Sequence, residues 1–170
     1  MKAVVSIIMG STSDMPVMRK AADFLNSMQI PFEINALSAH RVPEKVEEFA
    51  TNAHARGIKV IIAGAGGAAH LPGVVAAFAT VPVIGVPCRS SISIDGWDSI
   101  LSILQMPPGI PVATVGLDAA HNAGILAGQI LSISDESLHA RMVEFKMNMK
   151  QKIVKANRDL ANEKFDYRVQ

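Results

Sequence analysis

Five short, mostly apolar runs separated by stretches of helical periodicity constrain the fold of this chain more than any other feature. The runs span Val4–Met9, Phe32–Leu37, Val60–Ala63, Val83–Val86 and Val112–Val115. Such runs are typical of parallel strands that helices cover on both faces. Strands that alternate with helices predict right-handed crossovers and a three-layer α/β/α fold with a central parallel sheet. We expect the flavodoxin-like strand order 2-1-3-4-5.

The segments between these runs carry apolar residues at helical spacing. One helix is expected over Val17–Met28, and the next begins near Pro43 and closes at Gly57 as its C′ residue. Three more are expected at Leu71–Thr80, near Ser99–Gln105 and at Asp118–Ile133.

The C-terminal part of the chain has a different pattern. From Ser134 to about Glu163 one long helix is predicted, because apolar residues recur every three or four positions at Leu138, Met142, Phe145, Met149, Ile153, Ala156 and Leu160. At 1.5 Å per residue it would be about 40–45 Å long. Either it lies along its own sheet, or its apolar stripe docks on a neighbouring subunit. We therefore expect a catalytic α/β domain over residues 1–133, a C-terminal helix over 134–165 and a frayed tail over 166–170.

Composition narrows the class of protein. The 170 residues are 49% hydrophobic and only 18% charged, which favours a chain that covers part of its surface with copies of itself. A net charge of +1 without a basic stripe gives nucleic-acid binding no support. The single cysteine, Cys88, excludes an internal disulfide, and no motif indicates a metal. No apolar stretch is long enough to span a membrane, and we expect a cytoplasmic protein.

Three loops of small and polar residues follow the first three apolar runs. They are Gly10–Asp14, Ser38–Arg41 and Gly64–His70. Because parallel strands end at a common edge of the sheet, where ligands bind, these loops should converge on one pocket.

The first loop is suited to binding a phosphate. Gly10 is expected to let the chain turn off the strand, while Ser11 and Ser13 offer hydroxyl and backbone N–H groups at a helix start. Asp14 would accept hydrogen bonds from a ribose diol. The alternative is ordinary capping, with Ser13 or Asp14 as the N-cap residue before Pro16.

The second and third loops add acid–base groups and close backbone approach. Arg41 suits bidentate recognition of a phosphate or carboxylate, and His40 can exchange protons near neutral pH. The small residues from Gly64 onward let a ligand lie against the backbone, with His70 at their end; tight helix-to-strand packing is the alternative. Cys88 and Arg89 share this edge without an assigned role. His121 could also approach the pocket.

Several strings in these loops are similar to those of the PurE family of purine biosynthesis. They are M-G-S-T-S-D (Met9–Asp14), S-A-H-R-V-P (Ser38–Pro43), A-G-A-G-G-A-A-H-L-P-G (Ala63–Gly73), V-I-G-V-P (Val83–Pro87) and D-S-I-L-S-I-L-Q-M-P (Asp98–Pro107). The resemblance covers about residues 3–133, and its loops resemble class I members. One departure is Asp118–Ala123, where relatives often carry a lysine and a glycine-rich turn.

The resemblance implies an activity and residue roles. Class I members convert N5-carboxyaminoimidazole ribonucleotide to 4-carboxy-5-aminoimidazole ribonucleotide (CAIR) without a cofactor. By position, His40 would be the general acid/base, Ser11 and Arg41 would hold the phosphate, and Asp14 would bind the ribose. The base and carboxylate pocket would be lined by Ser38, Ala65, Gly66, His70 and Leu71.

The resemblance also implies a homo-octamer with sites near subunit junctions, and leaves open a transient contact with the ATP-dependent carboxyaminoimidazole ribonucleotide synthetase. Two other functions stay open at this point. One is direct carboxylation of aminoimidazole ribonucleotide with carbon dioxide, the class II activity. The other is a non-catalytic sensor of a phosphorylated nucleotide.

Overall fold

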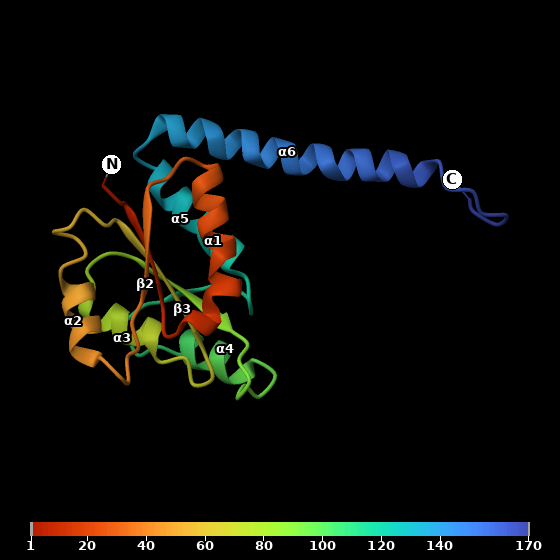
Figure 1. The fold of residues 1–170 in the computed structure, drawn as a ribbon. Coiled ribbons are helices and arrows are strands. Elements are labelled where there is room, and N and C mark those ends of the chain that lie inside the picture. The colour runs from red at the N-terminus through yellow and green to blue at the C-terminus, as the bar shows by residue number, and fades with distance from the viewer. Residues whose placement is uncertain (1, 170) are drawn as a thin grey trace.

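The computed structural model describes residues 2–169 and contains a five-stranded parallel sheet. The strands are β1 (Val5–Met9), β2 (Phe32–Ala36), β3 (Val60–Gly66), β4 (Val83–Cys88) and β5 (Ala113–Thr114). Their order is β2-β1-β3-β4-β5, which confirms the predicted topology (Figure 1). All five carboxyl ends therefore point to one edge of the sheet.

Helices cover both faces of this sheet, as predicted (Figure 1). A short 3-10 helix, η1 (Thr12–Asp14), precedes the α-helices, which are α1 (Met15–Ser27), α2 (Pro43–Thr51), α3 (Leu71–Phe78), α4 (Trp97–Leu104), α5 (Ala120–Ser132) and α6 (Glu136–Ala161). The first core lies between the sheet and α1 and α5, and the second between the sheet and α2, α3 and α4.

The alternation of side chains along β1 assigns residues to the two cores. Val5 and Ile7 face α1 and α5, whereas Ile8 faces α2 and α3, and all three side chains are fully buried. A strand buried on both faces needs apolar residues at every position rather than at every second one. This explains why the run around β1 is apolar at every position except Ser6, whose buried hydroxyl is hydrogen-bonded.

Several element bounds differ from the sequence expectation. β3 continues to Gly66, because Ala65 and Gly66 pair with β4 instead of opening the loop. β5 shrinks to two residues at the sheet edge. Helix α2 ends at Thr51, and Gly57, with φ +93°, closes the turns that follow the helix rather than its last turn.

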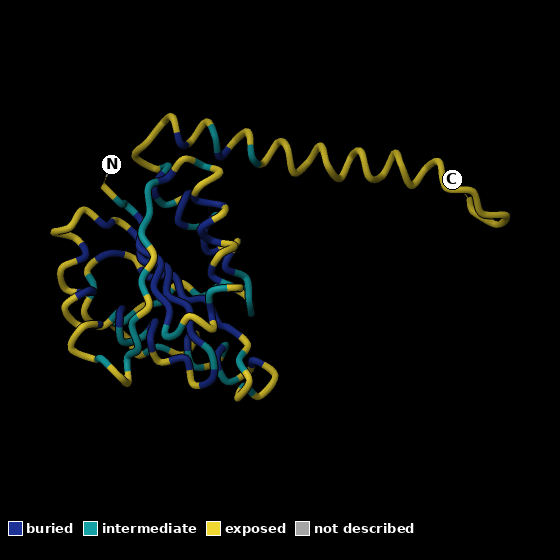
Figure 2. The backbone as a smooth tube through the Cα atoms, in the orientation of Figure 1, coloured by how far each residue is buried: buried dark blue, intermediate teal, exposed yellow. Residues whose placement is uncertain are grey.

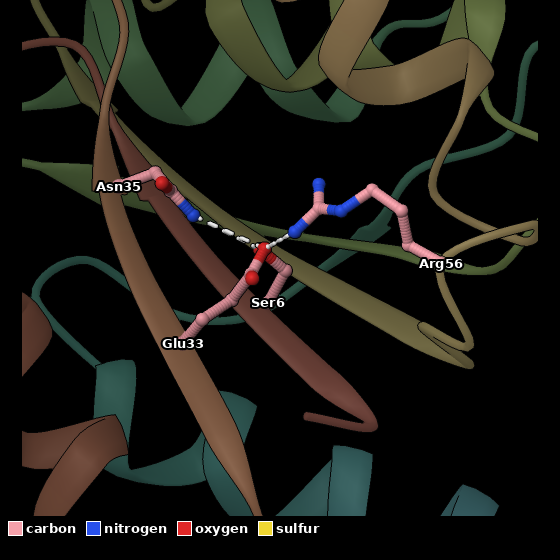
Figure 3. A network of polar contacts seen from close by, with 4 residues as sticks. All are labelled: Ser6, Glu33, Asn35 and Arg56. Carbon is pink, nitrogen blue, oxygen red and sulfur yellow. Dashed lines mark hydrogen bonds and ion pairs between the residues drawn. The ribbon is translucent and has the colours of Figure 1, made fainter. Parts of the chain in front are cut away.

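A polar cluster joins β1, β2 and the turn after α2 (Figure 3). The buried Ser6 hydroxyl donates to Glu33 Oε1 over 2.8 Å, and Asn35 Nδ2 donates to the same oxygen over 3.2 Å. Arg56 forms an ion pair with this carboxylate. Burial by itself raises the pKa of Glu33, but the hydrogen bonds from Arg56, Ser6 and Asn35 outweigh it and lower the pKa. The polar side chains of this cluster thus satisfy one another's hydrogen-bonding groups beside β2, an outer strand of the sheet.

Helix α6 leaves the domain and projects into solvent (Figures 1 and 2). Its first turns are anchored, because Leu138 and Met142 are buried against α5 and Arg141 Nε donates to Met28 O over 3.1 Å. Every residue from Lys146 to Ala161 is exposed. With 26 residues α6 is about 39 Å long, and it does not lie along its own sheet. No helix in the described part of the chain is long and apolar enough to cross a membrane.

Candidate active site

The predicted loops meet around one pocket of about 420 Å³ at the carboxyl edge of the sheet. All ten residues that the sequence singled out line it, namely Ser11, Ser13, Asp14, Ser38, His40, Arg41, Ala65, Gly66, His70 and Leu71. Parallel strands that end together are the reason, because they bring segments 60 residues apart in sequence to one place.

The first loop forms the polar wall of the pocket. Ser11 Oγ accepts a hydrogen bond from Ser13 N over 3.3 Å and so caps η1. The capping alternative is correct for the position of Asp14, which is the N-cap residue of α1, although its side chain makes no cap hydrogen bond. Asp14 is instead buried. Burial raises the pKa of its carboxyl, although a hydrogen bond with the backbone of Ser11 opposes this change.

Arg41 connects the second loop to the first. Its Nη2 donates to the carbonyl oxygen of Gly10 over 3.3 Å, while the side chain stays exposed at the pocket rim. The guanidinium retains further N–H donors for an anion. Gly10 itself is not needed for a left-handed turn, because its φ is not positive and a Cβ there would contact nothing within 4 Å. The chain does bend at Gly10, as expected, but this bend does not require a glycine.

The two histidines of the pocket contact each other directly. His40 Nε2 lies 2.7 Å from His70 Nδ1, which is hydrogen-bond distance. The rings meet edge to face, with centroids 4.9 Å apart. Because a neutral imidazole has one donor and one acceptor nitrogen, this contact ties the protonation of one ring to that of the other.

The glycines of the third loop serve both packing and site geometry. At Gly64 a Cβ would lie 2.3 Å from Met18 Sδ, so this glycine lets α1 approach β3. At Gly66 a Cβ would lie 2.8 Å from the Cys88 carbonyl oxygen, so this glycine admits the loop that follows β4. Gly67 has φ +61°, in the region that favours glycine. The packing interpretation therefore holds at Gly64 and Gly66, and the close approach of a ligand to this backbone stays a prediction.

Sequence reasoning missed one wall of the pocket. Ser90, Ser91 and Ile92, which follow β4, line it together with Gly10, Ala39, Ala68 and Ala69. Ser90 N and Ser93 Oγ are 2.9 Å apart in a hydrogen bond that shapes this turn. Their place in the sequence could have predicted this wall, because any segment directly after β4 must reach the same edge of the sheet.

The remaining residues at this edge are not exposed reactive groups. Cys88 is buried, and burial together with the charges of Asp14 and Asp118 raises the pKa of its thiol to about 12. Arg89 does not line the pocket; its backbone N–H donates to Asp118 Oδ1 over 2.9 Å. Asp118 thus holds the loop after β4 at the position where the chain departs from the PurE pattern.

His121 does not approach the pocket. Its ring packs edge to face on Phe24, 5.3 Å between centroids, and lies near Phe145 on the α1 and α5 side of the sheet. Within residues 2–169 no group of three histidine, cysteine or acidic residues is placed to hold a metal ion.

Comparison with known proteins shows which family the chain is related to. The family model described as AIR carboxylase matches residues 4–152. The chain belongs to the AIR carboxylase family. The N5-carboxyaminoimidazole ribonucleotide mutase of Pyrococcus abyssi is 56% identical over 86% of this chain and 83% of its own length. The mutase of the same name from Bacillus subtilis is 52% identical over 94% and 99%.

Solved structures of the family share the fold. The crystal structure of Treponema denticola PurE2-S38D superposes with a TM-score of 0.84, is 31% identical, and covers 94% of this chain and 99% of that chain. AIR carboxylase relatives thus match both the α/β domain and most of α6.

Proposed function

We propose that this chain converts N5-carboxyaminoimidazole ribonucleotide to CAIR in de novo purine biosynthesis, as an isomerase. One observation carries the proposal: a histidine, an arginine, a buried aspartate and small residues from three loops line a single pocket, in a chain 52–56% identical to two mutases over 86–94% of its length. A phosphate sensor would need the arginine and the serines, but not an acid–base group beside them.

The polar wall suits the ribonucleotide part of the substrate. Ser11, Ser13 and Arg41 lie together at the rim and would hold the phosphate through hydroxyl, backbone N–H and guanidinium donors. Asp14, next to them, would accept hydrogen bonds from the ribose hydroxyls. The base would then lie against Ser38, Ala65, Gly66 and Leu71.

The small-residue wall suits the transfer of the carboxylate. When the bond from nitrogen to the carboxylate breaks, His40 supplies the proton that the nitrogen gains, and carbon dioxide is released. The alanines and glycines offer a narrow, weakly hydrated space in which it stays beside carbon 4. Carbon 4 then attacks carbon dioxide, and His40 removes the carbon 4 proton while its electron pair returns to the ring.

The test is to mix purified protein with N5-carboxyaminoimidazole ribonucleotide and follow CAIR by ultraviolet absorbance. A parallel sample receives aminoimidazole ribonucleotide and bicarbonate. Rapid conversion in the first sample alone supports the mutase. Rapid conversion in the second alone means direct carboxylation, and silence in both with the nucleotide still bound means a sensor.

We also propose that the protein is a homo-oligomer in which α6 docks on a second copy. The stripe that is buried at Leu138 and Met142 continues along the same face to Met149, Ile153 and Leu160, which are 42%, 73% and 59% exposed. A continuous apolar stripe that leaves its own domain needs another apolar surface to cover it. Eight copies is the expectation from the family resemblance.

Charge favours the same arrangement. Residues 146–170 hold seven lysines and arginines against three acidic residues, whereas residues 1–145 hold nine against twelve. Residues 146–170 are therefore basic and the rest of the chain is acidic, so the C-terminal segment of one copy is attracted to the domain of another. We expect the oligomer to act in the cytoplasm, whose reducing conditions match the single buried thiol.

A further inference from the structure

The contact between His40 and His70 assigns different tasks to the two rings. We propose that His70 is a positioning residue: it holds His40 through the Nε2···Nδ1 hydrogen bond, accepts that bond while staying neutral, and leaves Nδ1 of His40 to exchange the proton with substrate. The inference rests on the proposed function, in which His40 is the acid–base group. It goes beyond a substrate-lining role for His70.

The backbone fixes His70 more firmly than its exposure implies. Its carbonyl oxygen accepts from Val74 N over 3.0 Å at the start of α3, and Ala69 N donates to Gly66 O over 3.1 Å in the preceding turn. Ser102 on α4 donates its hydroxyl to the Ala68 carbonyl oxygen. His70 thus stands on a turn held by α3, α4 and β3.

The turn that carries His40 is held by fewer hydrogen bonds. It lies in the turn between β2 and α2, closed by the bond from Val42 N to Ser38 O over 3.0 Å, and its side chain is exposed. An exposed ring on such a turn has several rotamers open to it. The bond to His70 selects one of them and places the ring against the pocket before substrate arrives.

Proton counting limits how the pair works. At 2.7 Å only one proton fits between the two nitrogens. If His40 donates, both rings carry a proton on Nε2, and Nδ1 of His40 is left to give its own proton to the substrate nitrogen and then, deprotonated, to act as the base. When Nδ1 then takes the carbon 4 proton, the His40 imidazolium still donates through Nε2 to the neutral His70. A neighbour that orients a catalytic histidine and stabilises its cation has this geometry.

Two substitutions at position 70 separate positioning from substrate contact. In His70→Asn the amide lies near the place of Nδ1 and can still accept from His40, whereas in His70→Gln it lies near the place of Nε2. We expect His70→Gln to lower kcat about 10–100-fold with KM changed less than about threefold, and His70→Asn to restore most of the loss. The exposed His54→Gln is the matched control and should leave both parameters unchanged.

Nitrogen-15 NMR of the free protein tests the contact without catalysis. The unsubstituted protein at neutral pH should show both His40 and His70 protonated on Nε2. In His70→Gln the ring nitrogens of His40 should shift toward a mixture of tautomers, and in His54→Gln they should not.

Three results overturn the proposal: a His40 ring without a proton on Nε2 in the free protein, a rise in KM with unchanged kcat in His70→Gln, or equal losses in the Asn and Gln variants. An inactive unsubstituted protein would overturn the proposed function instead. The NMR result would still decide whether the pair exists. If His70→Gln fails to fold, the unsubstituted spectrum and the Asn variant decide between the same alternatives.

Discussion

The carboxyl edge of the sheet and the α6 arm (Lys146–Ala161) differ in whether their side chains find partners within the same chain. At the edge, polar groups of one chain are hydrogen-bonded to each other, as in the contacts of Arg41 with Gly10 and His40 with His70. Along the arm, apolar side chains such as Ile153 are exposed, and nothing from their own chain covers them. Figure 2 shows this stretch of α6 coloured as exposed.

The two regions therefore differ in the kind of partner that each would bind. At the edge, residues of one chain form a pocket of about 420 Å³, a size that suits a small molecule. The arm lacks a surface as long as itself, which only a macromolecule supplies. Substitutions at the edge should therefore change activity, and substitutions in the arm should change the mass of the assembly.

The largest effect should follow from removing the acid–base group at the edge. His40→Asn keeps the size and polarity of the side chain but not the proton exchange, and should lower kcat by about 10²–10⁴-fold while substrate still binds. Activity is followed as CAIR formation, and binding by calorimetry. The sedimentation coefficient should stay that of the unsubstituted protein. Full activity would remove His40 from the mechanism.

The arm should respond to charges placed on its apolar stripe. In the double variant Met149→Glu, Ile153→Glu, two carboxylates would have to be buried in the proposed interface, so the assembly should dissociate into smaller species. Analytical ultracentrifugation measures this. The double variant Asn148→Glu, Lys152→Gln is the control, since it changes the net charge by the same two units about 100° around the helix from Met149 and Ile153. Unchanged mass in the double variant would show that the stripe is not the interface.

A smaller effect at the edge is expected for the phosphate contact. Arg41→Ala removes a charged donor that a bound phosphate would use, at a cost of about 1.5–3 kcal/mol, so KM should rise about 10–150-fold with a smaller change in kcat. Steady-state kinetics measures the split. An unchanged KM would assign the phosphate to other residues of the pocket.

The edge was more predictable from sequence than the arm, and the reason is topological. Once β1, β2 and β3 are recognised as parallel, the residues after each strand must meet, which brought His40 and His70 together without any knowledge of side-chain packing. The stripe of the arm was equally visible. Whether it would lie on its own sheet depended on where α5 ends and how α6 leaves it, which is decided by tertiary packing.

Other details of the site depended on packing that periodicity does not report. Gly64 is small because Met18 occupies the space beside it, and Gly66 because the loop after β4 passes close by. His121 has the residue type of a site group but faces Phe24. Residue type and position made these residues candidates for the site. Only the three-dimensional contacts show which of them serve packing instead.

A modest effect is expected from the polar cluster at Glu33, which lies away from both regions. Because the folded-state pKa of this carboxyl is lowered, its contribution to stability is present above the unfolded pKa, about 4.3, and is lost as pH falls through the folded pKa. Glu33→Gln should therefore cost about 1 kcal/mol or less at pH 7 and less at pH 3. Urea unfolding at both values measures this, with the exposed Glu47→Gln as control; an equal cost at both would exclude the ionic contribution.

The smallest effect is expected at Cys88, which lies beneath the edge. With a pKa of about 12 its thiol is ionised about a thousandth as often as a thiol of pKa 9 at the same pH, and it is buried as well. Iodoacetamide at pH 8 should leave the folded protein unmodified by mass spectrometry and alkylate it in urea. Cys88→Ala should keep kcat within about twofold, because the edge acts through His40 and the sulfur only fills space under it. Rapid alkylation of the folded protein would mean that this end of β4 opens, and the edge would then be no more self-contained than the arm.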